Sequence, residues 1–426
     1  MALNIYIETY GCSANQSSSE IMKGILARAG FNIVENEKLA DIVVLNTCIV
    51  KEPTIKGIEA RLKHFSKKKL IIAGCMPDAL AARIRRLAPK ASMLGTHHMG
   101  EILKAVRSVI EGKRIGLIGK RNEIKPGMPR IPKNKVIGIT QISQGCVNRC
   151  SYCIVRNVKG ALFSYPQEII LKDIKNALDS GAKEIWLTSQ DNAAYGVEKG
   201  RHMLPELLKQ ICNVKGKFYV RLGMMNPSSV LPICNELIKC YKNEKMFKFL
   251  HIPVQSGSDK ILKAMNRKYK VKDFINIVGK FRQEFPDITI ATDIIVGFPG
   301  ETNKDFQETL SLMKKIRPAV INISKFWPMP GTKAAKMNQV DVLQVKKRAS
   351  ELAELHRKMT FEMNSKLVGK KFRVLVDEKG FGNSLTARTP NYRPVVLPGA
   401  PSSLLGKFID VKIEKAMNFY LVGKYV

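Results

Sequence analysis

Three regions of the chain differ in how their hydrophobic residues are spaced. Residues 1–119 alternate short apolar runs with helical patterns, which is typical of a parallel sheet covered by helices. Residues 136–335 repeat this alternation, and their six strand candidates, each followed by a helical stretch, predict a partial (β/α)6 barrel. Residues 366–426 change to short alternating segments separated by Gly and Pro, which predicts a small antiparallel β-barrel. The predicted fold class is therefore α/β with a C-terminal barrel.

The apolar runs give the positions of the strands. In the first region the expected strands are Leu3–Glu8, Ile42–Asn46 and Leu70–Gly74. In the second region they are Ile137–Ser143, Glu184–Ser189, Phe218–Met224, Phe247–Val254, Ile288–Gly297 and Ala319–Pro328.

Two further segments connect these regions. Residues 120–135 hold three prolines and six basic residues without periodicity, and they are interpreted as a linker. Residues 336–365 have the pattern of a charged amphipathic helix. We thus expect an N-terminal domain at 1–119, a central domain at 136–335 and a barrel at 366–426.

The excess of basic residues favours a negatively charged binding partner. Lys and Arg number 71 against 36 Asp and Glu, a net charge of +35, and the excess is spread along the chain. A hydrophobic content of 45% excludes a disordered polycation, so a polyanion such as nucleic acid is the expected partner. A lysine-rich but merely solvated surface is the alternative. No apolar run reaches the ~18 residues of a membrane helix and the N-terminus lacks secretory features, so we expect a soluble, cytoplasmic protein without a membrane anchor.

Three of the nine cysteines are grouped in one loop. Cys146, Cys150 and Cys153 form C-x3-C-x2-C just after the first strand of the central region. Three thiolates on one loop can hold three corners of a [4Fe–4S] cluster and leave the fourth iron open to an external ligand. A zinc site is the alternative, but it needs a fourth ligand, and the following residues offer neither Cys nor His. The spacing therefore favours a catalytic iron–sulfur cluster.

Three other cysteines lie far apart in sequence but in equivalent places. Cys12, Cys48 and Cys75 each follow the end of an apolar strand. In a parallel sheet these ends meet at one edge, so the three thiols are expected to form a second cluster site. A single cysteine in such a place is commonly a small buried hydrophobe. Three more are assigned to the core or surface because they fall in helical patterns: Cys212, Cys234 and Cys240.

The loop resembles the signature of the radical S-adenosylmethionine (SAM) superfamily. That resemblance implies that the open iron of the loop cluster binds SAM, which yields a 5′-deoxyadenosyl radical on reduction. Tyr152, between the second and third cysteines, matches the aromatic position that the superfamily places beside the SAM adenine. Packing of the loop is an equal explanation for this tyrosine.

Motifs along the whole chain resemble the threonylcarbamoyladenosine tRNA methylthiotransferases of archaea and eukaryotes. They are TYGCSANQ at 9–16, LTSQDNAAYG at 187–196, RLGMMNP at 221–227, HIPVQSGSDKIL at 251–262, ATDIIVGFPGET at 291–302 and PMPGTKAAKM at 328–337. The resemblance implies a TRAM-like RNA-binding barrel and two [4Fe–4S] clusters, an auxiliary one at Cys12, Cys48 and Cys75 and a radical SAM one at Cys146, Cys150 and Cys153. It further implies thiomethylation at C2 of N6-threonylcarbamoyladenosine 37 in the tRNA anticodon loop, with an electron donor of unknown identity.

The chain departs from the family pattern just after the loop. The family usually has Arg-Gly where this chain has Lys159-Gly160. Lysine keeps the positive charge but lacks the two-pronged geometry of arginine. Ser164-Tyr165-Pro166 favours the threonylcarbamoyl branch over the bacterial one, which has Ser-Arg-Pro.

Further site residues are nominated by position. Polar residues lie at or near the ends of the barrel strands, where partial barrels bind ligands: Asp191, Arg221, Gln255 and Asp293. The residues nominated for SAM or base contacts are Gln190, Asp191, Arg221 and Gln255. Each is equally explained as a hydrogen-bonding residue of a strand end. GFPGE at 297–301 either lines the SAM pocket or makes a tight turn. RNA contacts are expected from the tail residues Lys370, Lys371, Arg373, Arg388, Tyr392 and Arg393.

Other functions remain open from the sequence. One is methylthiolation of isopentenyladenosine 37 or of a ribosomal-protein aspartate, and another is a non-enzymatic iron–sulfur regulator that binds RNA. The second cysteine set argues against the regulator. We expect a monomer.

Overall fold

The computed structural model describes residues 2–50 and 52–426, which divide into two compact units. The first unit contains residues 1–133, 139–148 and 154–173, and the second contains 134–138, 149–153 and 174–426. The C-x3-C-x2-C loop therefore contributes to both, with Cys146 in the first unit and the other two cysteines in the second. No helix of the described residues is long and apolar enough to cross a membrane.

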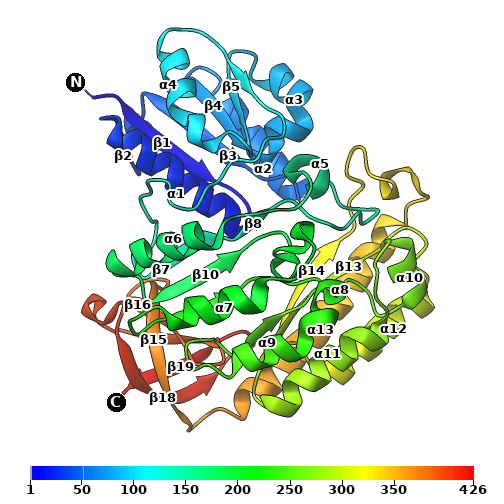
Figure 1. Ribbon diagram of the computed structural model, residues 1–426. Coiled ribbons are helices and arrows are strands. Elements are labelled where there is room, and N and C mark those ends of the chain that lie inside the picture. Colours follow the sequence, from blue (N-terminus) through cyan, green and yellow to red (C-terminus); the bar gives the residue numbers. More distant parts are fainter. Residues whose placement is uncertain (1, 51) are drawn as a thin grey trace. The chain divides into compact units, whose positions relative to one another are not determined.

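The first unit is built on a parallel sheet of six strands in the order β2-β1-β3-β4-β5-β6 (Figure 1). The strands are β1 Asn4–Thr9, β2 Asn32–Val34, β3 Ile42–Thr47, β4 Lys69–Gly74, β5 Ser92–Gly95 and β6 Gly116–Leu117. The helices are α1 Ser13–Arg28, α2 Glu52–His64, α3 Cys75–Leu87 and α4 Ile102–Ile110. The predicted parallel α/β domain is confirmed.

Alternate strand residues form the core of this sheet. Ile5 and Ile7 of β1 lie in one buried cluster with Ile42 and Val44 of β3 and with residues of α1 and α4. Every residue of β3 is buried, as expected for a central strand covered on both faces. Strand β3 pairs in register with β1 on one side and with β4 on the other, so the three central strands end together at one edge of the sheet.

The sequence predicts a linker at residues 120–135. In the structure, side chains of residues 120–133 form hydrogen bonds and an ion pair within the first unit. The Glu123 carboxylate accepts from the Met99 and Gly100 amides at 3.0 and 2.9 Å. Arg130 forms an ion pair with Asp173 at 2.7 Å. Residues 154–173 of the same unit contain α5 Val155–Lys159 and the first part of α6 Gln167–Asp179, whose end belongs to the second unit. The short strands β8 Ser143–Gln144 and β9 Phe163–Ser164 form an antiparallel pair.

The central region holds two three-stranded sheets, β11-β10-β7 and β12-β13-β14. All six predicted strands occur, as β7 Ile137–Gln141, β10 Glu184–Thr188, β11 Tyr219–Leu222, β12 Phe249–His251, β13 Thr289–Val296 and β14 Val320–Lys325. The helices that follow them are α7 Leu204–Asn213, α8 Pro227–Val230, α9 Cys234–Tyr241, α10 Asp259–Ala264, α11 Val271–Glu284 and α12 Asn303–Ile316. Cys212, Cys234 and Cys240 are buried in α7 and α9, in keeping with a packing role.

The predicted C-terminal barrel is confirmed as a closed barrel of five strands in the order β15-β16-β17-β19-β18. Its pairs are antiparallel as predicted, except that β17 and β19 pair in parallel. Its strands are β15 Lys371–Lys379, β16 Ser384–Arg388, β17 Pro394–Pro398, β18 Phe408–Ala416 and β19 Leu421–Tyr425, and α13 Val342–Ser365 precedes them. Closure leaves no unpaired sheet edge. Val374, Val376 and Val411 are among the residues that fill its core.

Candidate active site: two cysteine sets

Cys12, Cys48 and Cys75 lie at the carboxyl edge of three adjacent strands. Cys12 is the N-cap of α1 just after β1, Cys48 follows β3 directly, and Cys75 opens α3 after β4. Strand β3 pairs with β1 on one side and β4 on the other, both in parallel. The sequence-based expectation that these thiols gather at one edge agrees with this topology.

The backbone at this edge is packed so tightly that glycine is required beside two of the cysteines. Gly11 has φ +105°, and a Cβ there would lie 2.7 Å from the Cβ of Cys48 and 2.9 Å from its Sγ. Gly74 has φ +92°, and a Cβ would lie 2.5 Å from the Thr47 carbonyl oxygen. Both glycines let the chain turn from strand to cysteine at close quarters.

Two buried asparagines hold the loops that carry the thiols. The Asn15 side chain donates to the carbonyl oxygens of Tyr10 and Thr47, each at 2.9 Å. Asn46 donates to the Asn15 carbonyl at 2.8 Å. The loops after β1 and β3 are thereby joined to α1, and the cysteines on them are fixed in place.

Burial makes the Cys48 and Cys75 thiols hard to ionise in the absence of a metal. It raises the pKa of Cys48 and raises the pKa of Cys75 to about 11, and the positive charge of Lys159 acts in the opposite direction on both. A metal that binds thiolate removes the proton, so the set suits iron.

The donor set fits a cluster better than a single ion. Within residues 2–50 and 52–426, no three His, Cys, Asp or Glu side chains converge as ligands of one metal ion. A [4Fe–4S] cluster does not need such convergence, because each thiolate binds a different iron. None of the cysteines in the described chain is in a disulfide.

In the first unit, the loop around Cys146 is held by backbone contacts. The Cys146 amide donates to the Gly160 carbonyl at 3.2 Å, and Arg156 donates to the Cys146 carbonyl. Gly145 has φ +83°, and a Cβ there would lie 1.9 Å from the Ala161 carbonyl oxygen. A glycine before the cysteine is again obligatory.

In the second unit, the end of α10 holds the segment with Cys150 and Cys153. The Ser151 hydroxyl donates to the Ala264 carbonyl at 2.8 Å, and the Asn266 side chain donates to the Arg149 carbonyl at 2.7 Å. Arg267 donates through Nη1 to the Cys150 sulfur at 3.3 Å. A charged donor on a ligand sulfur stabilises the thiolate and tunes the cluster that it binds.

Arg267 also connects this segment to Asp191, one of the predicted SAM contacts. Its Nη2 donates to the Asn226 side-chain oxygen at 3.1 Å, and the Asn226 amide donates to Asp191 at 3.0 Å. The Ser229 hydroxyl donates to the other oxygen of Asp191 at 2.7 Å. Burial raises the pKa of Asp191 to about 6. Asp191 is thus a buried hydrogen-bond acceptor that is linked to Arg267 through Asn226.

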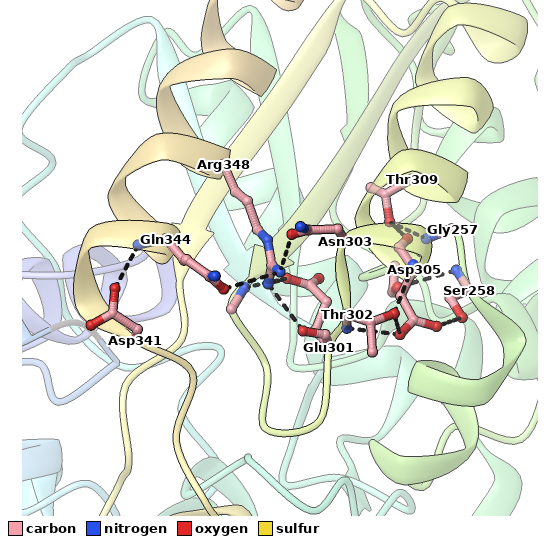
Figure 2. A network of polar contacts seen from close by, with 12 residues as sticks. Gly257, Ser258, Glu301, Thr302, Asn303, Asp305, Thr309, Asp341, Gln344 and Arg348 are labelled. Carbon is pink, nitrogen blue, oxygen red and sulfur yellow. Dashed lines mark hydrogen bonds and ion pairs between the residues drawn. The ribbon is translucent and has the colours of Figure 1, made fainter.

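Tyr152 lies beside the GFPGE segment. Its ring meets the Phe298 ring edge to face, with centroids 6.4 Å apart. The turn after Phe298 is fixed by Glu301. Its carboxylate is ion-paired with Arg348 of α13 at 2.8 Å (Figure 2). It also accepts from the Gly297 amide at 2.8 Å. At the start of α12, Asp305 accepts from Ser258 at 2.7 Å. Side-chain hydrogen bonds and an ion pair therefore stabilise the segment 297–305 and join it to the segment 255–258.

Two further nominated residues, Gln190 and Gln255, and the strand-end residue Asp293 differ in burial, backbone conformation and hydrogen bonding. Gln190 is half-buried at the end of β10. Gln255 has φ +72°, which is unusual for a residue with a side chain and often marks a functional site. Asp293 accepts from His251 Nε2 at 3.0 Å and from Asn322 at 2.6 Å.

Arg221 was nominated for a contact to SAM or the base, and in the structure its guanidinium packs against aromatic rings. Its guanidinium lies over the rings of Trp186 and Phe249, 5.2 Å from each centroid, and over Tyr392 of the barrel at 5.7 Å. These contacts are typical of a residue that joins the barrel to the central region.

The tail residues proposed for RNA binding divide into two groups. Lys370, Lys371 and Arg373 are exposed, although Arg373 also forms an ion pair with Asp410 at 2.7 Å. Arg388 is ion-paired with Asp377 at 2.9 Å, and Arg393 donates to Asn364 at 2.8 Å.

Tyr392 does not present a ring to solvent. It is 8% exposed and packs against Phe247 and Phe249, with ring centroids 4.7 and 4.9 Å away. Stacking of Tyr392 on a base is therefore wrong for this conformation, because the ring faces are covered by the central region. The aromatic side chains that the barrel region does expose include Phe381, Phe419 and Tyr420.

Sequence reasoning missed Arg267, Asn226 and the buried Lys125. Asn226 lies inside a motif that was singled out, RLGMMNP, but no pattern separates it from its neighbours. Arg267 follows a short helix among other basic residues, and Lys125 lies in a proline-rich basic stretch, where a solvated side chain is the usual outcome.

Family models match all three regions. The Radical SAM superfamily matches residues 140–313, Uncharacterized protein family UPF0004 matches residues 4–95, and the TRAM domain matches residues 365–426. These ranges correspond to the central region, the N-terminal sheet and the barrel.

Curated relatives resemble the chain over its full length. It is 39% identical to a Pyrococcus horikoshii protein named "Probable threonylcarbamoyladenosine tRNA methylthiotransferase", covering 100% of both chains. It is 35% identical to the Homo sapiens protein named "Threonylcarbamoyladenosine tRNA methylthiotransferase", over 99% of this chain and 74% of that one.

Two solved structures share the fold. The radical S-adenosylmethionine methyltransferase TsrM of Kitasatospora setae, with cobalamin and a [4Fe–4S] cluster, has a TM-score of 0.57 at 12% identity and covers 78% of this chain and 74% of its own. The cobalamin-dependent SAM radical enzyme OxsB has a TM-score of 0.55 at 11% identity, over 84% of this chain and 56% of its own. At such identity the likeness concerns the fold alone.

Proposed function

This chain belongs to the threonylcarbamoyladenosine tRNA methylthiotransferase family, and from that premise we propose that it replaces the C2 hydrogen of N6-threonylcarbamoyladenosine 37 in tRNA by a methylthio group. It is a radical SAM enzyme that acts on tRNA, with SAM and a [4Fe–4S] cluster as cofactors. The observation that carries the finer proposal is the gathering of Cys12, Cys48 and Cys75 at one sheet edge, in a chain that also carries the radical SAM loop.

Each cofactor has its own residues. Cys146, Cys150 and Cys153 would hold the radical SAM cluster, and Cys12, Cys48 and Cys75 a second, auxiliary [4Fe–4S] cluster. When bound, these groups and SAM supply the radical that activates an unreactive aromatic C2–H bond and the sulfur that replaces its hydrogen.

The protein's own side chains position the reactants. Arg267 orients the Cys150 thiolate, and Asp191 offers a buried acceptor to a ligand amine or hydroxyl. Tyr152 and Phe298 form an apolar wall that excludes water from the reacting groups. Gln190 and Gln255 are proposed as further contacts to SAM or the base.

Substrate binding is assigned to the barrel surface. The exposed Lys370, Lys371 and Arg373 would contact backbone phosphates, which fix the tRNA without reading its sequence. Position 37 is an unpaired loop base that can be extruded into a site. A cytoplasmic location is part of this proposal, and the electron donor is left open.

The test is a choice among three anticodon stem-loops that carry threonylcarbamoyladenosine, isopentenyladenosine or adenosine at position 37. The carboxylate of the first suits a cation in the pocket, whereas an isopentenyl group would leave that cation buried and unpaired. We expect thiomethylation of the first to be at least ~100-fold faster, as for roughly 3 kcal/mol. Comparable rates on isopentenyladenosine would indicate the bacterial type of activity, and no reaction on any RNA would favour a protein substrate.

A further inference from the structure

Lys159 is a buried lysine whose charge is not paired by any carboxylate in the described residues. It is 4% exposed, and within residues 2–50 and 52–426 its ammonium group makes no hydrogen bond or ion pair. A largely buried lysine whose ammonium has no carboxylate partner in the chain is suited to face a bound anion.

The position of Lys159 points to what that requirement is. Lys159 is the last residue of α5, which packs against α3, and α3 begins with Cys75. Its charge acts on both Cys48 and Cys75. The unpaired ammonium therefore lies within electrostatic range of the sheet-edge cysteines, all in the first unit.

A second buried lysine adjoins the first. Lys125 is fully buried, and its Nζ donates to the Gln144 side-chain oxygen at 2.6 Å. Burial, together with the positive charge of Lys159, lowers the pKa of Lys125 to about 7. The positive charges of the two lysines disfavour one another, and a negative charge placed beside them would relieve that repulsion.

The nearest carboxylates do not supply that charge as ion pairs. Glu123 accepts from two backbone amides and is paired with Arg121 at 3.2 Å. Asp78 accepts from the Thr96 amide at 2.7 Å and the Gly119 amide at 3.1 Å. Within residues 2–50 and 52–426, neither lysine forms an ion pair with a carboxylate.

We propose that Lys159, supported by Lys125, is the counter-charge of an anionic iron–sulfur cluster held by Cys12, Cys48 and Cys75, and that it sets the reduction potential of that cluster. The inference rests on the proposed function, because it takes the sheet-edge cysteines as cluster ligands. Lys159 acts through the cluster and is a positioning residue, since it touches no reacting atom. A lysine suits this task because its compact charge needs no planar partner.

The experiment isolates the auxiliary cluster in the full chain. Cys146, Cys150 and Cys153 are replaced by Ala, and the remaining cluster is titrated by electron paramagnetic resonance in four backgrounds: unchanged, Lys159→Met, Lys159→Arg and Lys172→Met. Lys172 is an exposed lysine of α6 in the same unit, so Lys172→Met is the matched control for loss of one charge.

Lys159→Met should lower the ratio of reduced to oxidised cluster about tenfold at a fixed applied potential, because reduction adds negative charge beside a lost cation; tenfold is 59 mV for one electron. Lys159→Arg should restore the ratio, and Lys172→Met should leave it unchanged. The same ratio in the Lys159→Met and Lys172→Met proteins would overturn the assignment of Lys159 while leaving the cluster in place. A protein without any cluster in the unchanged background would instead overturn the cysteine set and the proposed function with it.

Thermal unfolding of the cluster-free protein is the second measurement. Lys159→Met should raise the melting temperature there, because an apolar side chain replaces a largely buried lysine that has no carboxylate partner. A lower melting temperature would mean that Lys159 is a structural residue, and would contradict the proposal.

Discussion

Cys12, Cys48 and Cys75 come from three loops at the edge of one sheet, whereas Cys150 and Cys153 lie on a single short segment that the end of α10 holds. The first set is assembled only when β1, β3 and β4 have paired, so its formation depends on the fold of the whole domain. The second depends on a few local bonds. The cations also differ, since unpaired lysine charge lies near the first set and Arg267 donates directly to a sulfur of the second.

These differences suggest a division of labour. A charge that acts at a distance adjusts the potential of a cluster without restricting its open side. A guanidinium bonded to a ligand sulfur fixes geometry as well as charge. Under the proposed function the loop set needs a fixed geometry, because SAM would have to be oriented at the cluster that this set would hold.

The sharpest test of the division is to remove each set separately. Replacing Cys12, Cys48 and Cys75 by Ala should halve the iron content and abolish thiomethylation, yet preserve reductive cleavage of SAM. Replacing Cys146, Cys150 and Cys153 should halve the iron and abolish cleavage. Iron analysis and quantification of 5′-deoxyadenosine measure both outcomes.

The matched control is the triple change of Cys212, Cys234 and Cys240 to Ala, which lie buried in helices. It should keep the full iron content and lose only stability. Unchanged iron after loss of Cys12, Cys48 and Cys75 would show that these thiols are not ligands.

A second test uses the glycines before the cysteines. Gly74→Ala and Gly145→Ala each force a left-handed φ on a residue with a side chain and place a Cβ against a backbone oxygen. Strain and overpacking should together cost about 3 kcal/mol of unfolding free energy, and each variant should lose iron from its own set.

Gly57→Ala is the control for this pair. Gly57 lies in the middle of α2 with nothing within 4 Å of its added Cβ, and the change should stabilise the protein by ~1 kcal/mol. Denaturant unfolding measures all three. Retention of full iron in both the Gly74 and Gly145 variants would contradict the requirement for glycine.

The sequence was sufficient for the strands and for the position of Cys12, Cys48 and Cys75 after three adjacent strands, because apolar periodicity and parallel topology are local and general rules. It could not reveal the bonds of Arg267 or the burial of Lys125 and Lys159, since a basic residue in a loop carries no sign of what covers it. Tyr392 was misjudged for a related reason. An aromatic residue in an RNA-binding barrel suggests stacking, but its ring is used to pack the barrel against Phe247 and Phe249.

The third test concerns the arginine at the loop set. Arg267→Met removes a charged hydrogen bond to Cys150, a loss of roughly 1.5–3 kcal/mol, so reductive cleavage of SAM should fall at least about tenfold. Arg267→Lys should recover part of the rate, because it restores charge without the forked geometry. The potential of the auxiliary cluster is the internal control and should not move in either variant. Equal cleavage by the Met variant and the unchanged protein would remove the proposed contrast between the two cations.

The smallest effect is expected on the barrel surface, where a change should leave both cysteine sets intact. Lys371→Gln should weaken tRNA binding about threefold, since an exposed ion pair contributes less than ~1 kcal/mol. The slope of log affinity against log salt should flatten by about 0.9 for one lost phosphate contact. Arg388→Gln is the contrast, because Arg388 is engaged by Asp377 and its loss should lower stability without changing the slope. Fluorescence titrations of tRNA at several salt concentrations give the slope, and iron analysis checks that both clusters remain. An unchanged slope for Lys371→Gln would mean that this face of the barrel does not contact the RNA backbone.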